Sequence, residues 1–362
     1  MSNKLEEARK IINEVDAQMA ELFVKRMRAA EMVYEHKREF GLPILDQKRE
    51  DAVIEANSAL VEDEVLKGYY IDYLKHLMSV SRAYQYRMQS GLKVAYSGVE
   101  GAFAHIAAGR IFPEGNRVPY SDFKAAYDSV VRGESDVAVL PIENSYAGEV
   151  GQTMDLIFSG ELFINGIYEL EIHQNLLGLP DATVEDIRKV TSHPQALSQC
   201  HDYIKMRGFD AEEANNTALA AKTVAEANDK SLGAIASVET AEIYGLKVIE
   251  ANINKSGENT TRFAVLSKVK AASPSLSSTV LMFTVRHEAG SLASAIGIIG
   301  RYGYNMTALR SRPMKKHSWQ YYFYVEIDGT IDTENGAAMI GELNKVCDQL
   351  KVAGTFAPHT EI

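Results

Sequence analysis

The stretch Lys93–His105, KVAYSGVEGAFAH, decides the fold class of the larger part of this 362-residue chain. Its apolar start predicts a short buried strand, its two glycines predict a turn, and the residues that follow predict the start of a helix. The same texture, a short apolar run before a helical pattern, recurs four more times. Alternating strands and helices predict a mainly parallel α/β sheet. The recurrences are SDVAVLPIENS (135–145), KVTSHPQAL (189–197), GAIASVETA (233–241) and TRFAVL (261–266).

Upstream of this stretch, residues 1–90 contain only two of the 25 glycines of the chain and a single proline. Such a scarcity of chain-breaking residues predicts a nearly all-helical segment, with two shorter helices near 46–61 and 63–90. Before them, apolar residues recur at helical spacing over roughly forty residues. Because so long a helix exceeds what a compact monomer accommodates, we expect it to pack against a partner chain. The recurring apolar residues are Leu5, Ile12, Val15, Met19, Leu22 and Val33.

Downstream, the stretch AASPSLSS at 271–278 predicts a linker, and a compact series of short elements follows it. The order of that series, βαββαβ, is the ferredoxin-like pattern. The three textures divide the chain into domains at 1–90, 91–272 and 273–362. The elements of the last domain are expected at 278–285, 291–303, 305–313, 319–329, 334–350 and 351–359.

The composition argues against several classes of protein. A net charge of −11 disfavours binding to nucleic acid or to acidic lipid. No apolar run approaches the ~18 residues of a membrane span, and the first residues lack the apolar region of a signal peptide. Cys200 and Cys347 lie far apart and outside any CxxC pattern, so we expect neither a disulfide framework nor a cysteine zinc site. We therefore expect a cytoplasmic protein that binds neither nucleic acid nor membrane.

Polar residues of the helical segment fall where helix geometry lets them act together. Arg26 and Lys37 are eleven residues apart, about three turns, so they share one helix face. Two more sets share a face at i, i+3 or i+4 spacing. Any one pair of this kind is also typical of the solvated surface of a long helix. The two sets are Asp46, Arg49 and Glu50, and Ser81 with Gln85.

Taken together, these residues make the whole segment resemble the all-helical chorismate mutases of the intertwined-dimer type. The resemblance implies chorismate as the substrate. In that family the first long helix crosses to the partner subunit, so it also implies a homo-oligomer, a dimer or a tetramer, in which Arg9 serves the other chain's site. The residues that match the family's motif are Arg9, Arg26, Lys37, Asp46, Arg49, Glu50, Ser81 and Gln85.

The chemistry of chorismate agrees with these residue types. Chorismate is a dianion, and arginine side chains hold carboxylates bidentately. Its rearrangement is intramolecular, so the enzyme has only to hold the compact conformer and stabilise charge on the breaking ether oxygen. We assign Lys37 and Gln85 as donors to that oxygen and Glu50 as the partner of the ring hydroxyl. The other substrate-binding candidates are Arg9, Arg26 and Arg49 for the carboxylates, with Ser81 and Asp46.

The α/β segment carries small polar residues at its strand ends, which converge on the ligand cleft in an open α/β sheet. Ser97–Gly101 lies between a strand and a helix, where free N–H groups and the helix dipole favour an anion. Its GxxG pattern is not the GxGxxG of dinucleotide sites, and neither a Walker loop nor HExxH occurs. The nine histidines do not cluster at ligand spacing. We therefore expect neither a cofactor nor a metal.

The motifs GVEGAFAH, PIENS, SHPQAL and TRF resemble prephenate dehydratase over about residues 92–270. The resemblance implies prephenate as the substrate and a two-lobed α/β domain like that of periplasmic binding proteins. Loss of hydroxide and CO₂ from prephenate needs a donor at the leaving hydroxyl and anchors for the side-chain carboxylate. By resemblance, Thr261 is that donor. The other candidates are Arg262, Phe263, Asn144 and Ser145 near the substrate, and Glu143 and His193 as acids.

The βαββαβ segment, together with two short motifs, resembles an ACT regulatory domain. Such domains bind an amino acid between paired subunits, so the resemblance implies phenylalanine as a feedback effector; a plain dimerisation module is the alternative. The family's GALV motif reads GSLA here and its ESRP motif reads RSRP, so Arg310 replaces a carboxylate and reverses the charge beside the expected pocket. The expected effector residues are Gly290, Ser291, Leu292, Ala293, Arg310, Ser311, Arg312 and Pro313.

The resemblances together imply a bifunctional enzyme that turns chorismate into prephenate and then into phenylpyruvate. A mutase fused to prephenate dehydrogenase would need NAD and a GxGxxG turn, which the sequence lacks. An arogenate-type dehydratase stays open, because arogenate differs from prephenate only at the side chain. A non-catalytic amino-acid sensor is disfavoured, because a sensor has no need of Lys37 and Gln85 at catalytic spacing.

Overall fold

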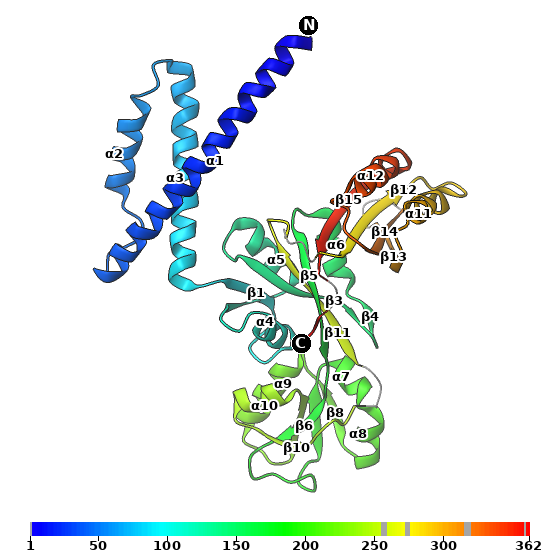
Figure 1. The fold of residues 1–362 in the computed structure, drawn as a ribbon. Coiled ribbons are helices and arrows are strands. Elements are labelled where there is room, and N and C mark those ends of the chain that lie inside the picture. The colour runs from blue at the N-terminus through cyan, green and yellow to red at the C-terminus, as the bar shows by residue number, and fades with distance from the viewer. Residues whose placement is uncertain (1, 255–258, 272–275, 315–319, 358–359) are drawn as a thin grey trace. The chain divides into compact units, whose positions relative to one another are not determined.

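The computed structural model describes residues 2–254, 259–271, 276–314, 320–357 and 360–362. The chain forms two compact units, which meet in the sequence at Gly91 and Leu92 (Figure 1). Across the described ranges, we find no helix both long and apolar enough to cross a lipid bilayer. Nor do the described residues gather three or more His, Cys, Asp or Glu side chains in a way that would hold a metal ion.

The first unit is all-helical, as the scarcity of glycine and proline predicts. Asp46 caps the second helix by accepting a hydrogen bond from the Arg49 backbone N–H at 3.0 Å. Asp63 caps the third by accepting from Val65 and Leu66. The helices are α1 (Ser2–Glu39), α2 (Gln47–Ser58) and α3 (Glu64–Ser90).

Helix α1 has 38 residues, which corresponds to about 57 Å of helix. Only its C-terminal part packs on α3, where Ala30 and Tyr34 are buried. Residues 4–25 are exposed throughout, and their apolar side chains include Leu5 at 56% and Leu22 at 63% exposure. The long apolar stripe predicted from the sequence is therefore present and uncovered in the single chain.

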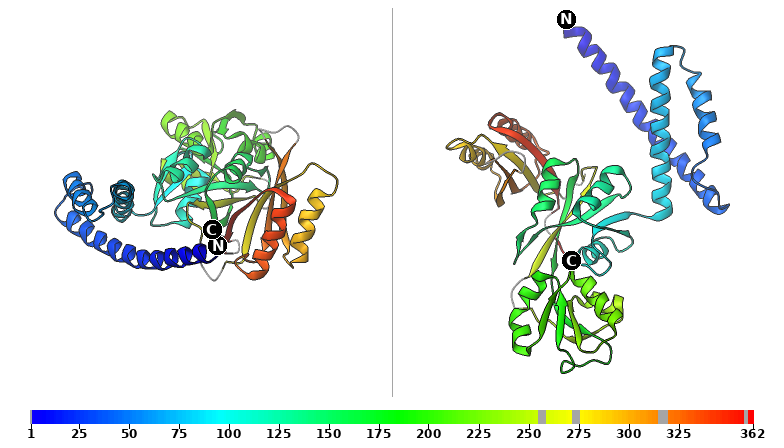
Figure 2. Two further views of the ribbon diagram at one scale, coloured as in Figure 1. Left: turned by 90° about the horizontal axis from the view of Figure 1, so that it is seen from above. Right: turned by 180° about the vertical axis from the view of Figure 1, so that it is seen from behind.

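The second unit contains two α/β lobes (Figure 2). The sheet of the first lobe has the order β16-β5-β11-β3-β1-β2, with β4 paired to β3. Its strands are β1 (Lys93–Ser97), β2 (Asn116–Tyr120), β3 (Val137–Asn144), β4 (Gly148–Glu149), β5 (Phe163–Glu171), β11 (Thr260–Ser267) and β16 (Thr360–Glu361). Its helices are α4 (Phe103–Ile111), α5 (Phe123–Arg132) and α6 (Gly151–Ser159).

The sheet of the second lobe has the order β10-β6-β9-β7-β8. The chain enters this lobe after β5 and returns to the first lobe in β11. Its strands are β6 (Asn175–Gly178), β7 (Lys189–Ser192), β8 (Asp210–Glu213), β9 (Leu232–Ala236) and β10 (Lys247–Glu250). Its helices are α7 (Pro194–Gln199), α8 (His201–Arg207), α9 (Thr217–Ala227) and α10 (Val238–Tyr244).

The prediction of mainly parallel strands is only partly right. β1 runs parallel to β2 and β3, and β7 runs parallel to β8 and β9. In contrast, β11 is antiparallel to β3 and to β5, and β6 is antiparallel to β9 and β10. The antiparallel pairs of the first lobe involve β11, the strand that leads the chain back from the second lobe, whereas β5 is the strand that leads it out.

The C-terminal segment has the predicted ferredoxin-like order, and its sheet runs β13-β14-β12-β15. The largest shift is that residues 347–350 extend the last strand rather than the second helix, since they pair with β12. Residues 272–275 of the predicted linker lie outside the described residues. The elements are β12 (Ser278–Val285), α11 (Ser291–Arg301), β13 (Met306–Pro313), β14 (Tyr321–Asp328), α12 (Glu334–Val346) and β15 (Cys347–Phe356).

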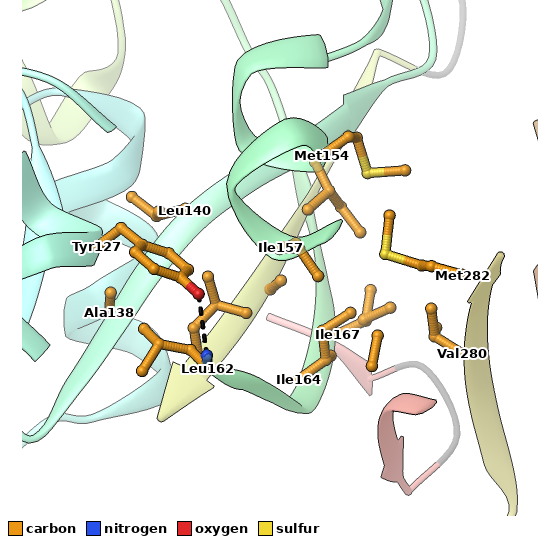
Figure 3. Close-up of a cluster of buried hydrophobic side chains, with 14 of the residues drawn as sticks. Tyr127, Ala138, Leu140, Met154, Ile157, Leu162, Ile164, Ile167, Val280 and Met282 are labelled. Carbon is orange, nitrogen blue, oxygen red and sulfur yellow. Dashed lines mark hydrogen bonds between the residues drawn. The ribbon is translucent and has the colours of Figure 1, made fainter. Parts of the chain in front are cut away.

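Strand β12 faces two cores at once, because alternate side chains of a strand point to opposite faces. Leu281 and Phe283 pack under α11 and α12. Val280 and Met282 point the other way and join Ile164 and Ile167 of β5 in the core of the first lobe (Figure 3). The C-terminal sheet therefore shares a hydrophobic core with the first lobe.

Candidate active sites

The helical unit contains a cavity of about 420 Å³ between its three helices. Seven of the eight polar residues singled out in the sequence line it, so residues from three separate helices do meet at one site. Apolar side chains, among them Val33, Ile44, Val53 and Met78, complete the wall. The seven polar residues are Arg26, Lys37, Asp46, Arg49, Glu50, Ser81 and Gln85.

Hydrogen bonds between helices hold the donors of this cavity in place. The Arg26 guanidinium donates to Ser81 Oγ, and Gln85 Nε2 donates to the Ala30 carbonyl at 3.1 Å. Lys37 Nζ donates to the Ile44 carbonyl at 2.5 Å. An ammonium has three N–H groups, a guanidinium five and an amide two, so each donor keeps hydrogens for a ligand.

The cavity is cationic although the chain as a whole is acidic. Two carboxylates, Asp46 and Glu50, face four cations, which leaves a surplus of two positive charges. One of the four, Arg82, is ion-paired with Glu50 and was missed in the sequence. Its spacing could have identified it in the sequence, because it lies three residues before Gln85 and so on the same helix face. The cations are Arg26, Lys37, Arg49 and Arg82.

Arg9 does not lie at this cavity. It stands on the exposed part of α1, seventeen residues before Arg26, which corresponds to about 25 Å along the helix. Its own chain therefore cannot bring it to the cavity without breaking the helix.

A second cavity, of about 330 Å³, lies between the two lobes of the second unit. The first lobe contributes Thr261 and Asn144, and the second lobe contributes His193, all three predicted from the sequence. The remaining lining residues are Ala102, Phe103, Phe123, Pro141, Val150, Ile172, Gln174, Gln195, Ala196, Gln199, Asn216 and Thr217.

Thr261 and Asn144 face each other across the paired strands β11 and β3. Asn144 Nδ2 donates to Thr261 Oγ1 at 3.0 Å, and the Thr261 side chain is nearly buried. Because the hydroxyl oxygen already accepts a bond from Asn144, its own proton remains for a group in the cavity. Asn144 Oδ1 in turn accepts from Gln195 Nε2 at 3.1 Å, which links the two lobes at this point.

His193 caps α7, with its Nδ1 accepting from the Gln195 backbone N–H at 3.2 Å. Burial lowers the pKa of His193 below its ordinary value. The ring is therefore neutral at neutral pH, with its proton on Nε2. A neutral imidazole donates a hydrogen bond but is a poor source of a proton.

No Lys or Arg side chain is among the described residues that line this second cavity. The starts of several helices lie at its wall instead: Phe103 begins α4, Phe123 begins α5 and Thr217 begins α9. The start of α4 has no side-chain cap, so its free backbone N–H groups and the helix dipole favour an anion, whereas the Asp122 carboxylate caps α5 and the Asn216 amide caps α9. The sequence had indicated the same turn before α4.

Amide side chains of the second lobe were not found from the sequence. Gln174, Gln195, Gln199 and Asn216 line the cavity, and only Gln195 stands in one of the quoted motifs, SHPQAL. Gln174 is 3% exposed, and its Oε1 has no hydrogen-bond partner among the described residues. This oxygen is a ready acceptor for a ligand hydroxyl or ammonium group.

Four predicted substrate contacts lie elsewhere. Arg262 directly follows Thr261 in β11, and Glu143 directly precedes Asn144 in β3. Both side chains therefore point to the opposite face of the sheet from Thr261 and Asn144. Phe263 is 2% exposed and packs in the core of the first lobe. Ser145 is exposed, and its Oγ accepts from the Thr260 backbone N–H at 2.9 Å. None of the four lines the cavity.

The predicted effector residues lie at one end of the C-terminal sheet. Gly290, with a left-handed φ of 84° that favours glycine, caps α11, whose first turn contains Ser291, Leu292 and Ala293. Thr284 and Arg312 both pair with Tyr322, so β12 and β13 end at the same side as that turn. Along β13, Arg310 and Arg312 face inward to Glu143 and Asp155, whereas Ser311 and Pro313 are exposed.

Two family models match the chain. Residues 8–86 match the model of chorismate mutase type II, and residues 94–271 match the model of prephenate dehydratase. The first match contains every residue assigned to the helical cavity, and the second contains both lobes and Thr261.

Relatives combine the two matches in one protein. The chain is 31% identical to the bifunctional chorismate mutase/prephenate dehydratase of Aquifex aeolicus, over 98% of both chains. It is 33% identical, over 75% of its length and 74% of the relative's, to arogenate dehydratase/prephenate dehydratase 2 of Arabidopsis thaliana. A solved prephenate dehydratase from Arthrobacter aurescens, in complex with L-Phe, is 25% identical over 74% of this chain and 90% of that one, with a TM-score of 0.68. The chain therefore belongs to the family of bifunctional chorismate mutase/prephenate dehydratases.

Proposed function

We propose that the helical cavity binds chorismate and that the interlobe cavity binds prephenate, so that one chain performs two consecutive steps towards phenylalanine. The observation that supports this best is the gathering of seven motif residues in one cationic cavity. Two single replacements test the assignment, at Lys37 and at Thr261, because each should abolish one activity and spare the other.

In the helical cavity, Arg26 and Arg49 hold the carboxylates of chorismate as bidentate partners. Lys37 Nζ and Gln85 Nε2 donate to the ether oxygen as the C–O bond breaks and negative charge grows on it. The new C–C bond forms within the same molecule, so no nucleophile and no external proton take part. Glu50, oriented by Arg82, accepts from the ring hydroxyl, while Asp46 fixes the start of the helix that carries Arg49 and Glu50.

In the interlobe cavity, the Thr261 hydroxyl donates to the hydroxyl that leaves the prephenate ring. The C–O bond breaks and the leaving group departs as hydroxide, stabilised by the hydrogen bond from Thr261 and protonated afterwards by solvent. The C–C bond to the ring carboxylate breaks with it, CO₂ departs, and the electron pair of that bond completes the aromatic ring. No external oxidant or reductant is consumed. Asn144 orients Thr261, and the neutral His193 donates a hydrogen bond rather than a proton.

A carboxylate of prephenate is assigned to the start of α4 rather than to arginine. The absence of Lys and Arg from the described lining, together with the uncapped start of α4 at the wall, supports this. Arogenate is the second candidate substrate, favoured by one observation. Gln174 Oε1, which has no partner among the described residues, would accept a hydrogen bond from the ammonium group that distinguishes arogenate from prephenate.

We infer that the active mutase is a homodimer in which α1 of one chain completes the site of the other. The exposed apolar stripe of α1 and the distance of Arg9 from its own cavity support this inference. A tetramer built from two such dimers satisfies the same observations. The two cysteines, free and far apart, support a cytoplasmic location.

Mixing two inactive variants should restore mutase activity if Arg9 acts in the partner's site. Arg9→Ala and Lys37→Met each damage both sites of a homodimer, but a mixed dimer keeps one intact site. After the subunits exchange, about a quarter of the wild-type mutase activity should return, since half of the dimers are mixed and half of their sites are intact. Recovery should be absent if Arg9 serves its own chain.

Phenylalanine is proposed as an effector of the C-terminal sheet. The ferredoxin-like order of this sheet supports it, as does the L-Phe bound to the solved prephenate dehydratase of Arthrobacter aurescens. Arg310 faces Glu143 of the first lobe, so the charge reversal in the RSRP motif does not turn its guanidinium towards the outer face of β13.

A further inference from the structure

A continuous set of ion pairs lies on the face of the first-lobe sheet opposite Thr261. At its centre, Arg262 approaches three carboxylates, Glu326 at 2.9 Å, Glu143 at 3.2 Å and Glu169 at 3.6 Å. Glu143 also accepts from Arg310 at 2.5 and 2.6 Å. The set thus runs from the first lobe, through β11 and β3, into strands β13 and β14 of the C-terminal sheet.

Two members of this set, Arg262 and Glu143, are each one residue away from a residue of the active site. Arg262 follows Thr261 in β11, Glu143 precedes Asn144 in β3, and the two pairs are adjacent rungs of the same ladder. A change in the Arg262–Glu143 pair therefore acts on the two strands that hold Thr261 Oγ1 and Asn144 Nδ2 at 3.0 Å.

The groups are buried enough for their pairing to matter. The side-chain exposures are 13% for Arg262, 18% for Arg310, 24% for Glu143 and 5% for Glu326. Removing one partner of a buried ion pair leaves the other charge uncompensated, and the surrounding groups then rearrange. Arg310 is further fixed over the Tyr324 ring, 5.5 Å from its centroid.

We propose that Arg262 and Arg310 are positioning residues for the dehydratase reaction. Arg262 does not touch the substrate; through Glu143 it ties the two strands that carry Thr261 and Asn144 to the C-terminal sheet. The Glu143–Arg310 pair is the point at which that sheet sets the geometry of the donor hydroxyl. This inference rests on the role proposed for Thr261.

Three variants break the link, Arg262→Met, Glu143→Gln and Arg310→Gln. Each should lower the dehydratase kcat by about tenfold while KM for prephenate stays within about twofold, because the substrate contacts remain and only the donor is displaced. Glu143→Gln/Arg310→Gln should be no slower than either single variant, because both remove the same link. Arg310→Lys, which keeps a charge for Glu143, should recover most of the turnover.

Lys351→Met is the matched control. Lys351 also crosses from the C-terminal sheet to the first lobe, where Nζ donates to the carbonyls of Ile157 and Gly160, but it does not contact the ion-pair set. Burial lowers the pKa of Lys351 to about 8, so the site already disfavours the charge. This variant should keep the wild-type kcat even where it lowers thermal stability. Mutase activity, in the separate helical unit, gives the amount of folded enzyme in every sample.

Three results would overturn the proposal: an unchanged kcat in Arg310→Gln, the same kcat loss in Lys351→Met, or a rise in KM rather than a fall in kcat in Arg262→Met. The last would make Arg262 a substrate anchor.

Two further measurements keep the other assignments separate. Full dehydratase turnover in Thr261→Val would reject the role of Thr261 itself. If millimolar phenylalanine neither inhibits the wild type nor gives heat in calorimetry, the effector assignment fails while the kcat comparison still stands.

Discussion

Replacement of Thr261 by valine should lower the dehydratase kcat by about a hundredfold to a thousandfold, the usual loss when one preorganised donor to developing charge is removed. Valine keeps the shape of threonine but has no hydroxyl that can donate a hydrogen bond to the leaving group. It also removes one acceptor of Asn144 Nδ2, which keeps its bond to Asn259 Oδ1 at 2.9 Å. Because the lost bond strengthens only as the hydroxyl leaves, KM for prephenate should change little.

Thr260→Val is the control for this experiment. Thr260 precedes Thr261 in β11 and does not line the cavity, so the same loss of a hydroxyl should leave turnover unchanged. Thr261→Ser, which retains the donor, should stay within about tenfold of the wild type. Wild-type turnover in Thr261→Val would contradict the proposed chemistry of the interlobe cavity.

Replacement of Lys37 by methionine should lower the mutase kcat by about a thousandfold, because the ammonium is assigned to the charge that grows on the ether oxygen. Methionine preserves the length and the apolar stem of lysine but cannot donate. The Ile44 carbonyl also loses its partner at 2.5 Å, which should lower the stability of the helical unit only slightly, since such a bond contributes about 1 kcal/mol. Turnover of added prephenate should be unaffected.

Lys48→Met provides the matched comparison for Lys37. Lys48 is an exposed cation near the start of α2 and does not line the cavity, so its loss removes the same charge without removing the donor. Mutase turnover should stay at the wild-type level. Equal losses in the two variants would mean that the overall field of the unit, rather than a placed donor, drives the rearrangement.

The helical unit was the part most accessible from sequence. Helix periodicity is local, so residues at i, i+3 and i+4 spacing can be placed on one face without knowledge of the fold. That is why Asp46, Arg49 and Glu50, and likewise Ser81 and Gln85, were found together. The position of Arg9 relative to a partner cannot follow from periodicity, because it depends on contacts outside the chain.

The α/β site was less accessible because its geometry depends on strand pairing. The TRF triplet was found, but which of its residues faces the substrate depends on the faces of β11, and those are set by its partners β3 and β5. Thr261 and Arg262 are neighbours in the sequence and lie on opposite faces. Gln174 and Gln199 carry no charge and belong to no recognisable motif, so only the tertiary structure shows them at the cavity.

In the C-terminal segment, the sequence predicted the order of the elements but not the contact of one side chain, Arg310. The order βαββαβ follows from alternating patterns and was correct. The reversed charge at Arg310 suggested a change in the effector pocket, whereas the side chain pairs with Glu143 of the first lobe. A long-range ion pair of this kind has no local signature, because its partner lies 167 positions away.

The product formed from chorismate by the purified wild-type chain shows whether both reactions occur on one chain. The enzyme is supplied with chorismate alone, without a nicotinamide cofactor, and prephenate and phenylpyruvate are followed over time. We expect prephenate to appear first and phenylpyruvate to replace it, because both cavities act in one chain. Accumulation of prephenate with no phenylpyruvate would contradict it, as would hydroxyphenylpyruvate formed only after NAD is added.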